Sequence, residues 1–236
     1  MNESSNIPVY DSTPPAPESF YQTWIKAITK SNERTFAEIA NSPGANSNKA
    51  YLWLALSDIV AVFVIMLVAL LSTASQYGDF GSALGRSLIS LICGAPISAV
   101  IGVLFFALVT AIIQWVAKLF KGTGSYSQLV YAAAAFTAPL MLISGAISAL
   151  SLILTPYIVL CFSILSIGLG IYALVLWVVA VKGVNRFGWG EAVGSVLLPG
   201  IVIGLLCGCL VIGILMLLGP VIGDVFSTIN QSLGGY

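Results

Sequence analysis

The uncharged stretch from Leu129 to Val181 is LVYAAAAFTAPLMLISGAISALSLILTPYIVLCFSILSIGLGIYALVLWVVAV. A helix needs about 20 apolar residues to cross the roughly 30 Å of hydrocarbon in a bilayer, so this stretch is too long for one span. Pro156 lies near its middle, and proline fits the first turn of a helix better than its interior. We therefore predict two spans, at about 129–154 and 157–181, joined by a tight hairpin.

Three further apolar runs have a similar length and lie at about 51–71, 89–116 and 193–218. The whole chain is 58% hydrophobic and only 8% charged, whereas soluble domains carry about 25% charged residues. We predict an all-α integral membrane protein whose five transmembrane helices form a bundle over 51–219. A short polar cytoplasmic tail precedes this bundle, and a short exterior C-terminus, 220–236, follows it.

The loop charges predict the orientation, because lysine and arginine are enriched in the cytoplasmic loops of membrane proteins. With five spans, Arg86 is alone on one side, and the other side carries Lys26, Lys30, Arg34, Lys49, Lys118, Lys121, Lys182 and Arg186. We expect the N-terminus in the cytoplasm and the C-terminus outside, in the plasma membrane if the host is a prokaryote. Merging the third and fourth spans would move Lys182 and Arg186 to the other side, so the charges also support five spans.

The polar N-terminal region divides into two parts. Met1 to Glu18 is rich in proline and polar residues, and we predict that it is disordered. Residues 19–50 are predicted to form a cytoplasmic juxtamembrane amphipathic segment, in which apolar residues recur at helical spacing: Phe20, Tyr21, Trp24, Ile25 and Ile28. A second short helix is expected to start at Thr35, since Thr35 and Glu38 fit a capping box.

The first of these helices has two interpretations. It lies on the membrane surface, with Trp24 facing the lipid and Lys26 and Lys30 facing the headgroups. Alternatively, it packs on the protein's own cytoplasmic loops. The sequence pattern is compatible with both.

Asp58 is the one ionisable residue inside a predicted span. A charge at the centre of a transmembrane helix costs about 2.5–3.5 kcal/mol on insertion scales, so such a residue is a functional candidate. Asp58 could face inward and bind a cation, a proton or a partner. Alternatively, its carboxylate is satisfied by hydroxyl groups or reaches water near the interface. A single acid is fewer than the several ionisable groups that usually form an ion or proton relay.

Small residues recur at every fourth position in two spans, a spacing that lets helix backbones approach closely in a membrane. They are Gly94, Ser98 and Gly102 in the second span, and Gly200, Gly204 and Gly208 in the fifth. Packing within one chain and homo-oligomerisation both fit this pattern.

Prolines are predicted to kink three spans, at Pro96, Pro139 and Pro199. Broken helices of this kind line the substrate sites of many transporters. The freed carbonyls can equally be satisfied by hydroxyl groups or neighbouring helices.

The composition argues against several classes of function. The chain has no histidine, which removes the commonest general base and metal ligand. A net charge of zero gives no basic footprint for nucleic acid. The four cysteines lie in apolar runs without metal-ligand spacing: Cys93, Cys161, Cys207 and Cys209. We predict no catalytic residue, no cofactor and no metal site.

The order of features resembles the Yip family, five-span membrane proteins named for interaction with Ypt/Rab GTPases, in its broad form that includes prokaryotic members. Three segments carry the resemblance. They are Thr35-Phe36-Ala37-Glu38-Ile39-Ala40 before the first span, Gly124-Ser125-Tyr126-Ser127-Gln128-Leu129-Val130-Tyr131 followed by Pro139 at the third, and Val196-Leu197-Leu198-Pro199 in the fifth.

The resemblance implies a cytoplasmic N-terminus, a short exterior C-terminus and no catalysis. For eukaryotic members it implies scaffold roles in vesicle formation, membrane shaping and binding of prenylated GTPases. Their first-span motif of Asp, a hydrophobic residue, an aromatic residue, Gly and Pro is not reproduced here, because Val60-Ala61-Val62 follows Asp58-Ile59. No individual binding residue is therefore carried over.

The leading functional hypothesis is a non-enzymatic membrane protein that organises the membrane or partner proteins. Its contact surface would be the cytoplasmic tail together with the Lys118/Lys121 and Lys182/Arg186 loops, whose basic residues all fall on one side. The bilayer itself is the other expected partner. The alternative is a small transporter or channel for an ion or small solute, which Asp58 and the prolines in the spans suggest.

Overall fold

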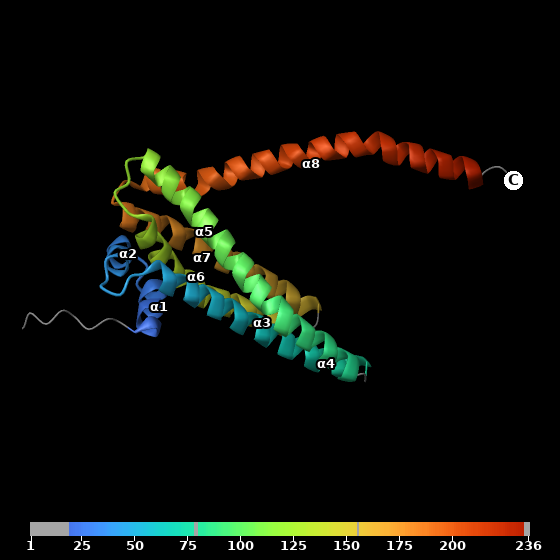
Figure 1. The fold of residues 1–236 in the computed structure, drawn as a ribbon, viewed down its shortest axis with the longest axis horizontal. Coiled ribbons are helices and arrows are strands. Elements are labelled where there is room, and N and C mark those ends of the chain that lie inside the picture. The colour runs from blue at the N-terminus through green and yellow to red at the C-terminus, as the bar shows by residue number, and fades with distance from the viewer. Residues whose placement is uncertain (1–18, 78–79, 155, 234–236) are drawn as a thin grey trace, which may run out of the picture.

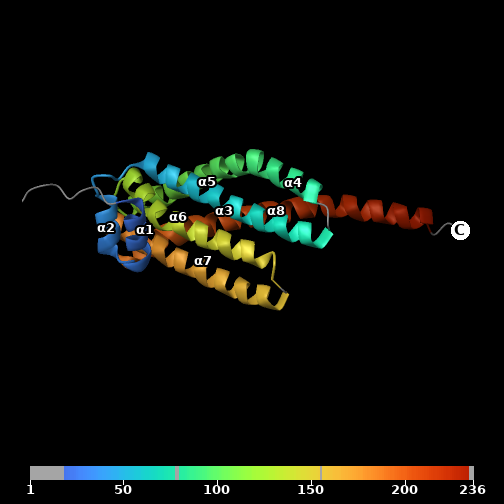
Figure 2. The same cartoon turned by 90° about the horizontal axis from the view of Figure 1, so that it is seen from below.

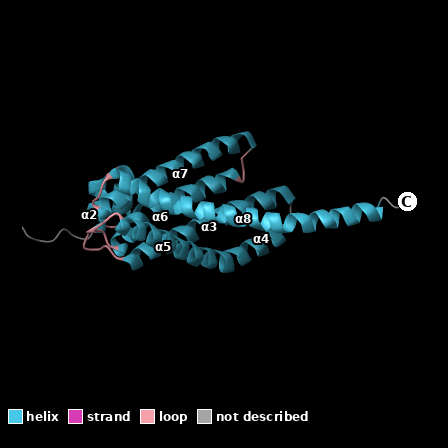
Figure 3. Ribbon diagram, turned by 90° about the horizontal axis from the view of Figure 1, so that it is seen from above, coloured by secondary structure: helices cyan, strands magenta, loops and turns pink. Residues whose placement is uncertain are grey.

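The computed structural model describes residues 19–77, 80–154 and 156–233. Every regular element in this part of the chain is a helix, and it contains no strand (Figure 3). The all-helical prediction is confirmed. The predicted disordered tail, Met1 to Glu18, lies outside the described residues.

The helices follow one another along the chain as α1 (Phe20–Thr29), α2 (Glu33–Ala40), α3 (Ser47–Tyr77), α4 (Phe80–Ile89), the π-helix η1 (Ser90–Gly94), α5 (Ala95–Leu119), α6 (Tyr126–Ser151), α7 (Pro156–Asn185) and α8 (Trp189–Leu233). The long uncharged stretch divides between Ser151 and Pro156, so proline occupies the first position of α7.

Four described segments are long and apolar enough to cross a membrane: Ser47–Ser72, Ser87–Leu119, Tyr126–Ser151 and Ile158–Asn185. The first part of α8, Trp189–Val202, is a shorter apolar helix. Many large apolar side chains on these helices are exposed, among them Ile101, Leu104 and Phe105 at 60% or more. Exposed apolar surface on this scale suits contact with lipid. The chain is an integral, multi-pass membrane protein.

The centre of the bundle is α6, which lies between α3 and α7 (Figure 2). Small side chains line this helix, and the four alanines from Ala132 to Ala135 are fully buried. Gly145 is buried against α3, since a Cβ built on it would lie 2.6 Å from the Cβ of Ala61. Such close backbone contact is a main source of helix association in lipid.

The helices α4, η1 and α5 form one continuous curved rod (Figure 2). At the end of the π-helix, the backbone N–H of Ala95 donates to the carbonyl of Ser90, five residues earlier. Pro96 follows immediately and has no N–H for the regular ladder. A π-turn is a common irregularity at which helices bend, and here it lies next to the predicted kink. By contrast, α6 and α8 continue as single helices through Pro139 and Pro199.

The short helices α1 and α2 cover one end of α6 and α7 (Figure 1). Phe36 of α2 is fully buried, and its ring meets that of Phe136 edge-on at 5.7 Å. The prediction that α2 starts at Thr35 is wrong, because its N-cap is Asn32, whose side chain accepts a hydrogen bond from the N–H of Thr35 at 2.8 Å. Asparagine is the stronger N-cap residue of the two.

Among the described side chains of the last helix, α8, those near its start pack on the bundle. Gly194 faces the ring of Phe120 at 3.5 Å, and Ser195 and Pro199 are buried. The helix then runs away from α5 and α7 (Figure 1), and the described side chains from Ile201 onward are mostly exposed.

Candidate functional site at the basic end of the bundle

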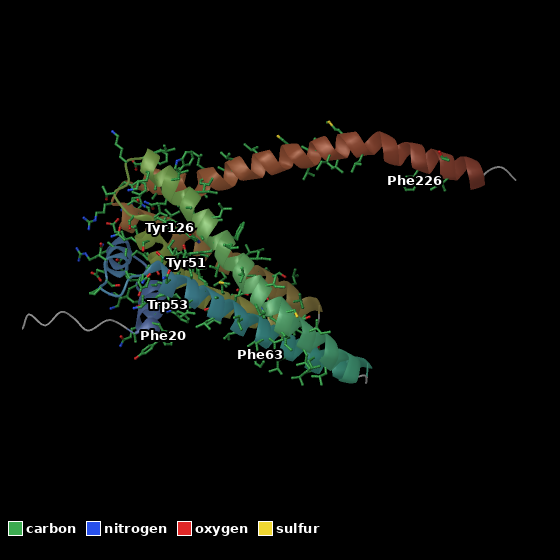
Figure 4. All side chains as sticks on the ribbon, in the orientation of Figure 1. Phe20, Tyr51, Trp53, Phe63, Tyr126 and Phe226 are labelled. Atoms are coloured by element: carbon green, nitrogen blue, oxygen red, sulfur yellow. The ribbon has the colours of Figure 1, made fainter. Side chains whose placement is uncertain are left out.

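Eight of the nine basic residues gather where α1 and α2 cover the bundle, and the ninth, Arg86, lies on α4 at the other end. We call the end that α1 and α2 cover the basic end (Figures 1 and 4). It comprises α1, α2, the start of α3 and the ends of α5 and α7, and it carries Lys26, Lys30, Arg34, Lys49, Lys118, Lys121, Lys182 and Arg186. The acidic side chains described there are Glu33, Glu38 and Glu191. The basic end is therefore positively charged overall.

Tryptophans accompany these basic residues. Trp115 on α5 is 65% exposed and Trp189 at the start of α8 is 56% exposed, each within a few residues of a lysine or arginine. Tryptophan is enriched where membrane proteins cross the boundary between hydrocarbon and headgroups. Exposed tryptophans next to lysines and arginines suit a position at such a boundary.

A buried polar contact joins α5 to the end of α7. Gln114 Nε2 donates to the carbonyl of Gly124 at 2.7 Å and to Asn185 Oδ1 at 3.0 Å. Asn185 Nδ2 in turn donates to Gln114 Oε1 at 3.3 Å and to the carbonyl of Val181 at 3.1 Å. Gln114 and Asn185 are 4% and 1% exposed, so both amides depend on these partners. We call this set of contacts the amide clasp.

Two glycines of the loop between α5 and α6 make room for the amide clasp. A Cβ on Gly122 would lie 2.6 Å from Asn185 Oδ1, and one on Gly124 would lie 2.6 Å from Val184 Cγ1. The neighbouring Thr123 donates through both its N–H and its hydroxyl to the carbonyl of Asn185, each at 3.2 Å. The loop is thereby fixed on the end of α7.

The segment that follows Gly124 ties α6 to α2 and α3. Ser125 and Gln128 form a capping box at the start of α6. Figure 4 shows Tyr126 beside Tyr51, and their hydroxyl groups are 2.8 Å apart. Ser47 donates to Ser127 at 2.7 Å, and Gln128 donates to Asn41 at 2.9 Å. The polar residues of this segment are therefore structural connectors.

The backbone of α2 lies directly against α7. A Cβ on Gly183 would be only 2.4 Å from the carbonyl oxygen of Glu33, so this close approach requires glycine. Lys182 donates to the Glu33 carboxylate, and its Nζ lies 4.3 Å from the centre of the Trp189 ring. The side chain of Lys182 is only 15% exposed. Its contacts with the Glu33 carboxylate and the Trp189 ring offset the free-energy cost of partly burying its charge.

One face of α1 packs on the protein itself. Thr23 and Ala27 are buried, and Trp24 meets the ring of Trp53 edge-on at 6.1 Å. Lys26 pairs with Glu38 of α2 at 3.2 Å. The sequence left open whether α1 lies on the membrane surface or packs on the protein. The face of α1 that carries Trp24 packs on the protein.

Another face of α1 is exposed, because Tyr21 and Ile25 are more than half exposed. Phe20 is also more than half exposed, although its ring meets that of Trp24 edge-on at 5.4 Å. Lys30 caps the C-terminus of α1 and is also exposed. Contact of these residues with the membrane surface stays a prediction.

Asp58 and two of the predicted packing residues come together between α3 and α5. Ser98 Oγ donates to Asp58 Oδ2 at 2.7 Å. Asp58 and Gly102 line a cavity of about 340 Å³, whose wall is otherwise mostly apolar and includes Trp177. Thr137 also lines this cavity, and its hydroxyl is buried and has no hydrogen-bond partner among the described residues.

The remaining predicted packing glycines touch no other helix in the part of the chain that the structure describes. A Cβ on Gly200, Gly204 or Gly208 would meet no atom within 4 Å, and one on Gly94 would meet only Ser90 of its own rod. Their role in helix association stays a prediction.

The structure also identifies contact residues that the sequence patterns did not single out: Gln114, Gly145, Gly183 and Asn185. Gln114 could have been noticed as an amide within an apolar span. Gly145 and Gly183 are not part of a regular spacing of small residues. What makes them necessary is the close approach of another helix, which the sequence does not reveal. Within the described chain, no group of three Cys, Asp or Glu side chains could hold a metal ion.

Comparison with known proteins identifies the family. Neither a curated protein nor a solved structure matches the chain. The model of the Yip1 domain matches residues 26–221, a range that includes α2, the amide clasp and the start of α8. The match confirms the resemblance noted from the sequence, and the chain belongs to the Yip1 domain family.

Proposed function

We propose that this chain is a non-enzymatic membrane scaffold that recruits partner proteins to its basic end. In this proposal the basic end faces the cytoplasm, and five helices cross the bilayer at about 51–71, 89–116, 129–154, 157–181 and 193–218. The segment 220–236 is then a short exterior C-terminus. If the host is a prokaryote, the membrane is the plasma membrane.

The length and composition of α8 support the fifth span. The helix is unbroken from Trp189 to Leu233, and the uncharged run within it, at about 193–218, is long enough to cross the hydrocarbon. The positive charge of the basic end supports the orientation, because positively charged loops are retained in the cytoplasm.

The main support for the scaffold role is that the basic end is held rigidly by contacts between helices. Its surface is not a set of loose loops, because the amide clasp, Gly183 and the pair of Lys182 with Glu33 fix α2 and the α5–α6 loop on α7. Lys118, Lys121 and other cations are exposed on this fixed support. A pre-organised basic surface suits recognition of an acidic surface on a partner protein.

Charge reversal tests this role. Proteins crosslinked to the full-length chain in native membranes would be compared between the wild type and the double variant Lys118→Glu, Lys121→Glu. The matched control is Arg86→Glu, which changes a basic residue at the other end of the bundle. We expect the double variant to lose partners that the control retains. Recovery of the same partners at the same yield by all three proteins would contradict the proposal.

The cavity at Asp58 supports a second candidate, a channel or transporter for an ion or small solute. Asp58 and Thr137, whose hydroxyl has no partner among the described residues, line the same cavity and could both contact a small cation. Flux into liposomes that contain the purified protein discriminates the two functions. Absence of flux through the wild type removes this candidate, whereas flux that is lost in Asp58→Asn would support it.

A further inference from the structure

An open pocket of about 360 Å³ lies where the first turn of α2 meets the last turn of α7. Its charged lining consists of Glu33, Arg34, Lys182 and Arg186, with Ala37 and Phe187 between them. Three of these four charges are positive. The pocket is separate from the Asp58 cavity, which lies deeper between α3 and α5.

Backbone geometry builds this pocket. Gly183 allows α2 to approach α7 so closely that Lys182, in the last turn of α7, and Arg186, just after its end, line a pocket together with the first turn of α2. Arg186 has a φ of 55° and ends α7, and its N–H donates to the carbonyl of Lys182 at 2.8 Å. The positions of these two cations are thus set by the end of a helix.

The charges in the pocket are not balanced. Lys182 is compensated by the carboxylate of Glu33. The guanidinium groups of Arg34 and Arg186 have neither an ion pair nor a hydrogen bond to any residue that the structure describes. After the pair of Lys182 with Glu33, the pocket therefore keeps two positive charges.

The arrangement suits one class of ligand. A guanidinium group is planar and can donate two parallel hydrogen bonds to a phosphate. The first turn of a helix adds N–H groups that lack a carbonyl partner and the positive end of the helix dipole. Two arginines beside such a turn match the charge and the acceptor oxygens of a phosphate group.

We propose that this pocket binds a phosphate group, carried either by the headgroup of an anionic lipid or by a soluble phosphorylated molecule. The exposed aromatic ring of Trp189 next to Lys182 suggests that the pocket lies at the level of lipid headgroups. Basic pockets between transmembrane helices accept anionic headgroups in other membrane proteins. The site does not require the scaffold role, because it rests on the geometry of α2 and α7.

The test uses the full-length protein in a mild detergent and two probes. One is a short-chain phosphatidylglycerol, with the corresponding phosphatidylcholine as a neutral reference, and the other is inorganic pyrophosphate. Binding is measured by native mass spectrometry for the lipids and by calorimetry for pyrophosphate. Tighter binding of phosphatidylglycerol than of phosphatidylcholine identifies a lipid as the source. Binding of pyrophosphate alone identifies a soluble ligand, and binding of neither overturns the proposal.

Variants then locate the binding. The double variant Arg34→Gln, Arg186→Gln is expected to weaken binding about tenfold or more, since it removes the charge-assisted hydrogen bonds that the two guanidinium groups donate to the phosphate. The matched control, Lys118→Gln, Lys121→Gln, removes two positive charges from the same end of the bundle outside the pocket. An equal loss in both double variants would show non-specific attraction and overturn the site.

Glu33→Gln is expected to change the affinity for the phosphate probes in the opposite direction. It removes the negative charge from the pocket and releases Lys182, so we expect binding to become severalfold tighter. A variant that merely perturbed the fold would not bind more tightly. Unchanged or weaker binding by Glu33→Gln, in a protein that unfolds at the wild-type temperature, would count against the proposal.

Discussion

The side-chain amides of Gln114 and Asn185 donate hydrogen bonds to each other across the ends of α5 and α7, at 3.0 and 3.3 Å. The two residues are 71 positions apart in the chain. Each amide is buried, so each depends on the other for a partner that water cannot supply.

Replacement of one member of this pair is expected to destabilise the protein. Gln114→Leu leaves Asn185 Oδ1 and the carbonyl of Gly124 without a partner, and a buried polar group left unpaired costs about 1–3 kcal/mol. Unfolding in detergent measures the loss. The control Ser163→Ala, which removes a hydroxyl bonded only within its own helix, should change stability by less than about 0.5 kcal/mol.

The double variant Gln114→Leu, Asn185→Leu extends this test. It should cost less than the sum of the two single variants, because the second change removes a group that the first had already left unpaired. Additive costs would mean that the two amides do not stabilise each other.

The contact of Gly183 with the backbone of α2 predicts a local effect. In Gly183→Ala the new methyl group would collide with the carbonyl of Glu33, and overpacking of this kind typically costs about 1–3 kcal/mol. We expect α2 to move away from α7 and trypsin to cleave faster at Arg34. Gly168→Ala on the same helix is the control, since a Cβ there meets nothing within 4 Å. Equal cleavage rates in the two variants would contradict the expectation.

The number and direction of the spans can be measured by cysteine labelling. In a chain whose four native cysteines are replaced by alanine, single cysteines would be introduced at Ser42, Thr123, Leu152 and Phe226. A membrane-impermeant maleimide applied to intact cells should label Leu152→Cys and Phe226→Cys and spare the other two. A chain with four spans would instead place Phe226 on the same side as Ser42.

The exposed glycines of α8 predict an association between two chains. Gly204→Leu would place a large side chain in the middle of the ridge formed with Gly200 and Gly208, where a second copy could pack closely. We expect self-association in liposomes to weaken about tenfold, as single-molecule photobleaching can measure, because overpacking costs about 1–3 kcal/mol. The control is Gly213→Leu, which lies on another side of the same helix. If both variants associate as the wild type does, the ridge is not a contact between copies.

The positions of the helices were predictable from the sequence because they depend on local properties. Apolar runs of sufficient length predicted α3, α5, α6 and α7, and the preference of proline for a first helical turn predicted where α7 begins. The aromatic spacing after Ser19 similarly predicted α1. The start of α2 was misplaced by two residues because Asn32 caps the helix more strongly than Thr35 does.

The contacts between helices were not predictable from the same signals. In water an apolar stripe identifies the buried face of a helix, but in a membrane both the lipid and the protein interior are apolar. The spacing of small residues therefore singled out Gly102, at which a Cβ would meet nothing within 4 Å, and not Gly145, at which a Cβ would collide with Ala61. The pairing of Asp58 with Ser98 likewise depends on how α3 and α5 are juxtaposed.

The contact between Glu33 and Lys182 has a consequence for biosynthesis. The two residues are separated by 149 positions, so α2 emerges from the ribosome long before its binding surface on α7 exists. At about 5–20 residues per second, translation of that interval takes roughly 7 to 30 seconds. Throughout this time the apolar faces of α2, including Phe36 and Ile39, have no partner on α7. The nascent chain therefore completes its basic end only after α7 has been made, although that end contains the two earliest described helices.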